Sequence, residues 1–133
     1  GRIFINGQDV TDIPPKAHHM PAWCFYPMSK RREVGANWFT QSYERRLEMM
    51  HEHGASGRRY AGRVAQYVTG STGLDDYEWG VTLFAVNPDD LKEVVYTMRF
   101  DQASAVYAEF GPFYTGLVAA PETVLDRVGV TGG

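Results

Sequence analysis

Residues 62–98 read GRVAQYVTGSTGLDDYEWGVTLFAVNPDDLKEVVYTM, which is two strand-like runs followed by a helical run. Extended backbone over 62–69 would point Val64, Gln66 and Val68 to one side and Ala65 and Tyr67 to the other, which predicts a strand, and 77–86 predicts a second strand. The glycines and aspartates of 70–76 predict the turn between them. We therefore expect a hairpin.

The helical run after this hairpin is the clearest element of the sequence. Asn87 predicts its N-cap and Pro88 its first turn, and it ends near Arg99 and Phe100. The apolar side chains with helical spacing predict its buried face. They are Leu91, Val94, Val95 and Met98.

A strand and a helix are predicted before the hairpin. The strand runs over 22–26 and is ended by Pro27, and the helix runs from about Ser42 to His53, with Gly54 as its terminating residue.

The region after the second helix predicts three elements, an extra turn over 103–107, a last strand over 109–118 and a short helix over 121–128. A short strand at 2–6 with a turn at Asn6–Gly7 is predicted near the start.

The order of the main elements is β-α-β-β-α-β, which predicts an α+β protein of the ferredoxin-like class. Its antiparallel sheet would carry both helices on one face and leave the other face open and apolar. Strands containing Trp23, Phe25, Tyr67 and Trp79 would build that face. We expect an arm over 1–20, one domain over 21–119 and a tail over 120–133.

Composition excludes several classes of protein. The chain has 133 residues, 44% hydrophobic and 22% charged, which fits one globular domain rather than a disordered chain. No apolar run approaches the roughly 20 residues of a membrane span. The net charge of −3 argues weakly against nucleic-acid binding. The single cysteine, Cys24, excludes an internal disulfide framework and favours a reducing cytoplasm. Because the chain starts at Gly1, we expect a processed or partial product.

Two histidines lie close together in the first predicted helix, His51 and His53. At this spacing the imidazoles point about 200° apart, so they do not easily share one metal ion. Either alone suits haem iron, which binds neutral imidazole. From the residues alone, a solvated or helix-capping histidine is the favoured interpretation of each.

Four further side chains are candidates for chemistry. Tyr26 could donate a proton or lose an electron, and Lys30 could hold a carboxylate or phosphate. Gln66 interrupts an apolar alternation, which fits a position facing a ligand. Arg99 fits an anion site or a cation that complements the helix dipole. An edge aromatic, a solvated lysine and an exposed glutamine are the plainer interpretations of the first three.

Together the motifs resemble those of the C-terminal half of the coproheme decarboxylases, within the chlorite dismutase-like haem superfamily. The matching blocks follow one another in order over roughly residues 22 to 118. They are Cys24–Arg32, Asn37–Trp38, Glu44–Arg46, His53–Gly54, Gly57–Gly62, Thr69–Ser71, Gly73–Phe84, Met98–Asp101, Ser104–Ala105 and Glu109–Phe113.

This resemblance implies a fold, a reaction and an assembly. The fold would be a ferredoxin-like half of the dimeric α/β-barrel type. Hydrogen peroxide would drive oxidation of two propionates of iron coproporphyrin III to vinyl groups, with loss of carbon dioxide, to give haem b. The porphyrin would be both substrate and cofactor. The subunits would form a homopentamer, or this chain would assemble with a separate N-terminal half.

The resemblance also implies a role for each site residue. His53 would be the iron ligand, Tyr26 the radical residue that attacks the propionate, and Lys30 its neighbour. Met28 and Gln66 would line the pocket, and a chlorite-degrading relative would have arginine at position 66. Arg99 and Ser104 would hold propionates.

Two features depart from the resemblance. The N-terminal half is missing, and position 102, where a carboxylate polarising the proximal histidine is expected, holds Gln102. A neutral amide there would make the histidine less anionic. Two alternatives to the enzyme stay open. One is a haem carrier or sensor without decarboxylase activity, and the other is a structural subunit that binds no porphyrin.

Overall fold

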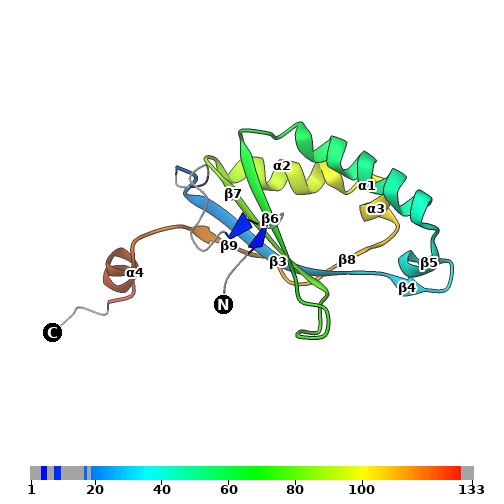
Figure 1. Cartoon of the computed structure of the whole chain (residues 1–133). Helices are drawn as coiled ribbons and strands as arrows, with labels where there is room; N and C mark the ends of the chain where they lie inside the picture. The colour runs from blue at the N-terminus through cyan, green and yellow to red at the C-terminus, as the bar shows by residue number, and fades with distance from the viewer. Residues whose placement is uncertain (1–3, 6–7, 10–16, 18, 130–133) are drawn as a thin grey trace.

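The computed structural model describes residues 4–5, 8–9, 17 and 19–129, and its centre is one antiparallel sheet covered on one face by helices (Figure 1). The main elements follow one another as predicted, with the last strand in two pieces. They are β3 (Ala22–Lys30), α1 (Tyr43–Arg58), β6 (Val64–Gly70), β7 (Trp79–Ala85), α2 (Pro88–Met98), α3 (Gln102–Ala105), β8 (Ala108–Phe110) and β9 (Tyr114–Leu117).

The strand order is β6-β7-β3, with β8 and β9 both pairing with the free side of β3. This arrangement confirms the ferredoxin-like class and the hairpin, since β6 and β7 pair antiparallel from Val64 with Ala85 to Gly70 with Trp79. The smaller elements lie outside the sheet. They are β1 (Phe4–Ile5), β2 (Gln8–Asp9), β4 (Arg32–Glu33), β5 (Ala36–Asn37) and α4 (Pro121–Arg127). The predicted turn at Asn6–Gly7 lies outside the described residues.

Pro27 does not end its strand, contrary to the sequence-based expectation, because β3 continues to Lys30. The carbonyl of Pro27 accepts a hydrogen bond from the amide of Gly111, which lies in the connection between β8 and β9. In an antiparallel strand the backbone nitrogen and carbonyl of one residue point to the same side. The nitrogen of Pro27, which has no hydrogen to donate, therefore faces the gap between β8 and β9, where no strand residue needs it. The same interruption divides the predicted strand 109–118.

Helix α1 is longer than the sequence suggested. Ser42 caps it as expected, its hydroxyl accepting from the amide of Arg45 at 3.2 Å, but Gly54 lies inside the helix. The glycine with left-handed backbone is Gly62, at φ 82°, beyond the helix end at Arg58. The sequence therefore predicted correctly that a glycine follows the helix, but that glycine is Gly62 rather than Gly54.

Helix α2 begins and ends where the sequence predicted. Leu91 and Val94 are buried, and Val95 and Met98 pack against the same core. The Asn87 side chain makes no capping hydrogen bond, and Asp90 is buried against Arg63 at 2.8 Å instead of only facing the helix dipole.

The two faces of the sheet differ in what covers them. Alternate residues of β3 and β7, such as Cys24 and Leu83, form the main core with α2. On the other face, Ala65, Tyr67 and Phe84 pack only against Ala17 and Met20 among the described residues. Trp23, Phe25 and Tyr67 lie on this open face as predicted.

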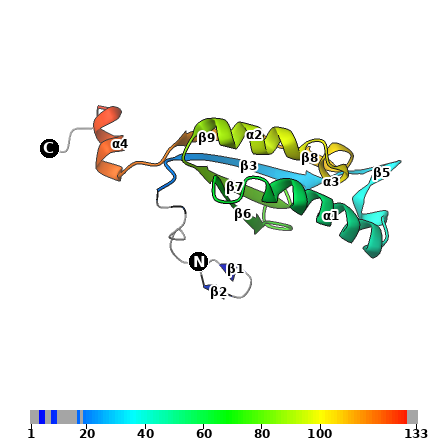
Figure 2. The same ribbon diagram turned by 90° about the horizontal axis from the view of Figure 1, so that it is seen from above.

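Trp79 is the exception, because it lines a cavity on the helix-covered face. Helix α1 packs mainly on α2 and α3 rather than on the strands (Figure 2). The cavity lies between α1 and the sheet. No helix among the described residues is long and apolar enough to cross a membrane.

Candidate haem-binding site

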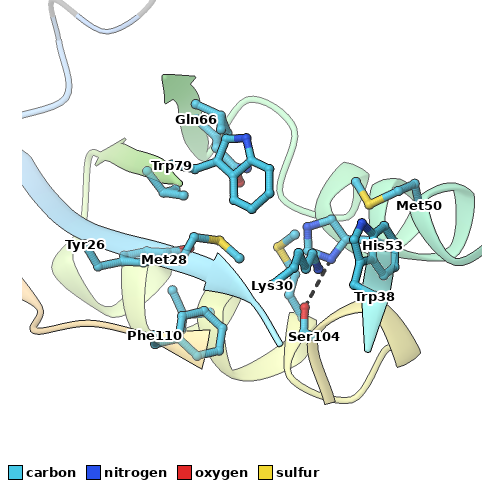
Figure 3. Close-up of a pocket in the computed structure, with 14 residues that line it drawn as sticks. Tyr26, Met28, Lys30, Trp38, Met50, His53, Gln66, Trp79, Ser104 and Phe110 are labelled. Atoms are coloured by element: carbon cyan, nitrogen blue, oxygen red, sulfur yellow. Dashed lines mark hydrogen bonds between the residues drawn. The ribbon is translucent and has the colours of Figure 1, made fainter. Parts of the chain in front are cut away.

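A largely apolar cavity of about 310 Å³ lies between the sheet, α1, α2 and α3 (Figure 3). Small-molecule sites commonly enclose about 300–1,000 Å³. Six of the seven predicted site residues line it. They are Tyr26, Met28, Lys30, His53, Gln66 and Ser104.

His53 projects from α1, and a buried carboxylate fixes its ring. Its Nδ1 lies 2.9 Å from Oδ2 of Asp101 and 3.3 Å from the hydroxyl of Ser104. An ionised carboxylate only accepts, so Nδ1 carries the proton and donates it to Asp101. In the neutral imidazole this contact leaves Nε2 as the acceptor, which is the form that binds a metal ion.

Asp101 is the carboxylate in contact with His53, which the sequence interpretation expected one position later, at 102. Its other oxygen accepts from the amide of Ser104 at 3.0 Å, which makes Asp101 the N-cap of α3. Gln102 instead contacts Arg45, away from the histidine. The expected loss of a polarising carboxylate is therefore wrong, because position 101 supplies it. In the sequence, the pattern Asp-x-x-Ser over 101–104 at a helix start could have indicated that Asp101 is held in place as a cap.

His51 is exposed and does not line the cavity, whereas His53 does, so the two imidazoles point to different sides. No group of three or more His, Cys, Asp or Glu side chains within the described ranges could hold a free metal ion. One fixed histidine over an apolar cavity instead suits a metal that brings its other ligands with it, as haem iron does. The donor set of this chain therefore fits an iron porphyrin.

Lys30 comes from the end of β3, and its partial burial affects the pKa of its side chain. Its Nζ donates to the carbonyl of Ala103 at 2.6 Å and lies 4.6 Å from the centre of the Trp38 ring. Burial lowers the pKa of Lys30 to about 8, while the negative charge of Asp101 opposes that shift. Buried Glu78 accepts from the Lys30 amide at 3.1 Å and fixes the backbone.

Tyr26 lies two pleats before Lys30 on the same face, with Met28 between them. Tyr26 is 8% exposed. The centre of its ring lies 4.4 Å from that of Phe113, on which it stacks, and 5.7 Å from that of Phe110. Burial raises the pKa of Tyr26 to about 12, helped by Cys24 and opposed by Arg99. The phenol is therefore protonated at neutral pH, and its ring packs against those of Phe110 and Phe113.

Gln66 and Arg99 differ in their relation to the cavity. Gln66 comes from β6 and lies on the sheet side, next to Trp79, whereas His53 lies on the helix side (Figure 3). Arg99 does not line this cavity. It caps the end of α2 with its guanidinium 5.2 Å from the centre of the Phe110 ring, and its predicted contact with a propionate stays a prediction.

Comparison with known sequences and structures agrees with this geometry. The family model described as chlorite dismutase matches residues 5–119. The chain belongs to the chlorite dismutase family. A coproheme decarboxylase of Staphylococcus carnosus is 51% identical over 110 residues, which are 83% of this chain and 44% of that protein.

Two further relatives of the family are named for haem binding. A protein of Natronomonas pharaonis is 54% identical over 102 residues, covering 77% of this chain and 16% of that protein. The solved structure of a haem-binding protein from Thermus thermophilus superposes with a TM-score of 0.80 at 45% identity, covering 84% of this chain and 45% of that chain. The chain thus spans under half the length of these relatives.

Proposed function

We propose that this chain binds iron coproporphyrin III in the cavity and takes part in its peroxide-dependent decarboxylation to haem b. The observation that carries the proposal is the convergence of His53, Lys30 and Tyr26 on one apolar cavity. The bound porphyrin would supply iron redox chemistry. Two relatives that are named coproheme decarboxylases, 51% and 48% identical to this chain, support the same substrate.

Each of the three side chains would have its own task. His53 would bind iron through Nε2, since Asp101 holds Nδ1. Lys30, as an ammonium, would hold a propionate carboxylate near the sheet. Tyr26 would give up one electron and its phenolic proton together, both consumed in the reduction of hydrogen peroxide to water, because its raised pKa disfavours the phenolate. Among described residues its hydroxyl has no hydrogen-bond partner in the protein, so that oxygen is available to a substrate.

The binding part of the proposal is tested by two histidine variants. Purified chain is titrated with iron coproporphyrin III and followed by its Soret absorption. His53→Ala should abolish or severely weaken the five-coordinate spectrum, whereas His51→Ala should leave it unchanged because His51 lies outside the cavity. The opposite ranking would contradict the assignment.

The catalytic part is tested by adding hydrogen peroxide and measuring products by chromatography and mass. Tyr26→Phe keeps the ring and its aromatic contacts, so porphyrin should bind while haem b formation stops. Tyr43→Phe, on the exposed start of α1, is the matched control and should react normally. Binding without product in the unaltered chain would favour the carrier or sensor, and no binding would favour the structural subunit.

The proposal extends to organisation and location. We infer that residues 1–20 act as an arm, 21–119 as the haem-binding domain and 120–133 as a tail. The open sheet face supports assembly with further copies, in a pentamer, or with a separate N-terminal half. Cytoplasmic location is part of the same proposal, on the ground of the single buried cysteine.

A further inference from the structure

A buried carboxylate to which the proposed function gives no task lies next to the candidate haem site. It belongs to Glu78, the residue before β7, and its side chain is 8% exposed. Burial of a carboxylate costs free energy unless hydrogen bonds and an opposite charge compensate it. One oxygen, Oε2, accepts from the amide of Lys30 at 3.1 Å, and the other pairs with the guanidinium of Arg32. Both partners lie at the end of β3 or just beyond it.

The lengths of β3 and β7 explain why a side chain makes these bonds. The two strands pair as far as Met28 with Trp79, and β3 continues for two more residues to Lys30. A longer β7 would offer a backbone carbonyl to the Lys30 amide, and the Glu78 carboxylate accepts from that amide instead. Glu78 therefore continues the pairing of β3 beyond the end of β7.

Glu78 is itself held in place through its backbone. Its amide donates to the hydroxyl of Ser29 at 3.2 Å, and its carbonyl accepts from the amide of Ser71 at 2.8 Å. The side chain, the amide and the carbonyl of this residue are thus all engaged. The carboxylate consequently has a fixed position relative to the sheet, from which it can fix the end of β3.

The side chain of Lys30 depends on the direction in which its backbone points. A lysine has a flexible four-carbon stem, and holding it in one conformation costs entropy. Here Nζ crosses to the carbonyl of Ala103 in α3 and lies over the ring of Trp38. Because Lys30 is the last residue of β3, its backbone needs support from both sides. Ala108 of β8 pairs with it on one side, and Glu78 binds its amide on the other.

We propose that Glu78 is a positioning residue of the candidate haem site, which holds the end of β3 so that the ammonium of Lys30 faces the cavity and can bind a carboxylate. The inference rests on the proposed function, in which that carboxylate is a propionate. Glu78 does not line the cavity, whereas Lys30 does, so Glu78 acts through Lys30.

NMR of the chain without porphyrin tests the position of Lys30. The chain has three lysines, so labelled lysine side chains give few signals, and Lys30→Arg identifies the signal of Lys30 by its loss. Because Nζ lies 4.6 Å from the centre of the Trp38 ring, the ring current should shift the neighbouring ε-protons upfield. Glu78→Met has a similar volume but does not bind the Lys30 amide as a carboxylate does. The chain should fold, and the signal should move to that of an ordinary lysine.

Matched variants separate positioning from a general loss of structure. Glu78→Gln should keep the shifted signal, because its amide oxygen can still accept from the Lys30 N–H. Asp90→Leu removes another buried carboxylate that is paired with an arginine, away from the cavity, and should leave the signal unchanged. If Glu78→Met does not fold, Glu78→Asp, one methylene shorter, should move the signal in the same direction. A Lys30 signal that stays in place, or one that moves equally in Asp90→Leu, would overturn the proposal.

Binding of iron coproporphyrin III, measured by its Soret absorption, tests whether Glu78 acts through Lys30. Glu78→Met should lower the affinity by about tenfold, as for one charge-assisted hydrogen bond, and should have no further effect in a Lys30→Ala chain. Equal losses in the two backgrounds would overturn the proposal. An unaltered chain that binds no porphyrin would contradict the proposed function instead, and the NMR signals would still decide whether Glu78 positions Lys30.

Discussion

At the scale of single residues, the pair His53 and Asp101 defines the site. Asp101 accepts from the imidazole of His53, which makes the ring a better electron donor, and also caps α3, so one carboxylate links His53 to Ser104. The neighbouring Gln102 has neither contact. This difference between adjacent residues gives a sharp prediction.

Asp101→Asn should lower the affinity for iron coproporphyrin III by roughly 10- to 100-fold, the usual cost of losing a partner of a metal-binding histidine. Asparagine still caps a helix, so the fold should persist. The iron–histidine stretching frequency of the reduced complex should fall. Gln102→Ala should change neither quantity, and an equal effect of both variants would contradict the assignment.

Lys30 gives a prediction about pH. Its pKa of about 8 lies below the ordinary value of 10.5, so the ammonium is present below pH 8 and is lost above it. Affinity for iron coproporphyrin should therefore fall, by about tenfold for one charge-assisted hydrogen bond, as pH rises through 8. Lys30→Arg should remove this step, because arginine stays charged. A step that persists in the arginine variant would assign it to another group.

At the scale of elements, the junction of β8 and β9 positions Tyr26. Gly111 donates to Pro27 there, and Phe110 and Phe113 on either side of it clamp the phenol. A Cβ at Gly111 would lie 2.7 Å from Pro27 and 2.7 Å from the Tyr77 ring. The junction therefore has no room for a side chain.

Gly111→Ala should destabilise the fold by about 1–3 kcal/mol, as overpacking of a tight site does. Thermal unfolding would measure the loss. Gly70→Ala is the matched control in the hairpin, since a Cβ there meets nothing within 4 Å, and its melting temperature should be unchanged or slightly raised. A neutral Gly111→Ala would show that β8 and β9 can move apart freely.

At the scale of the whole molecule, the open sheet face predicts assembly. Trp23, Phe25, Tyr67, Phe84 and Tyr114 share this face, and only Ala17 and Met20 cover part of it among the residues described. Trp23, Phe25, Tyr67 and Phe84 are half-buried and Tyr114 is 54% exposed, and a contiguous apolar surface of this kind is commonly an interaction site. The chain should therefore have a mass in solution well above 15.0 kDa, or bind a separate partner.

Light scattering after gel filtration measures that mass. Phe25→Asp on the open face should reduce the assembly, whereas Leu74→Asp, an exposed residue of the turn after β6, should not. A soluble monomer of the unaltered chain would contradict the expected assembly.

The sequence alone predicted the order of the elements, and six of its seven candidate site residues line the cavity. Alternation over 62–69 placed Gln66 on the same side of the strand as Val64 and Val68, and α2 was predicted to its ends, because local periodicity and capping depend on neighbouring residues. The blocks shared with the decarboxylases marked His53, Tyr26 and Lys30, which the residues alone left open.

Only the tertiary structure decided what depends on contacts between distant segments. Asp101 meets His53 across 48 positions of sequence, and no local pattern indicates which of two adjacent residues will face a helix. Pro27 remains in a strand because its missing donor falls between β8 and β9. Trp79 lies in the cavity rather than on the open face because pairing fixes which side each β7 residue takes. Burial, which follows from packing, lowers the pKa of Lys30 and raises that of Tyr26.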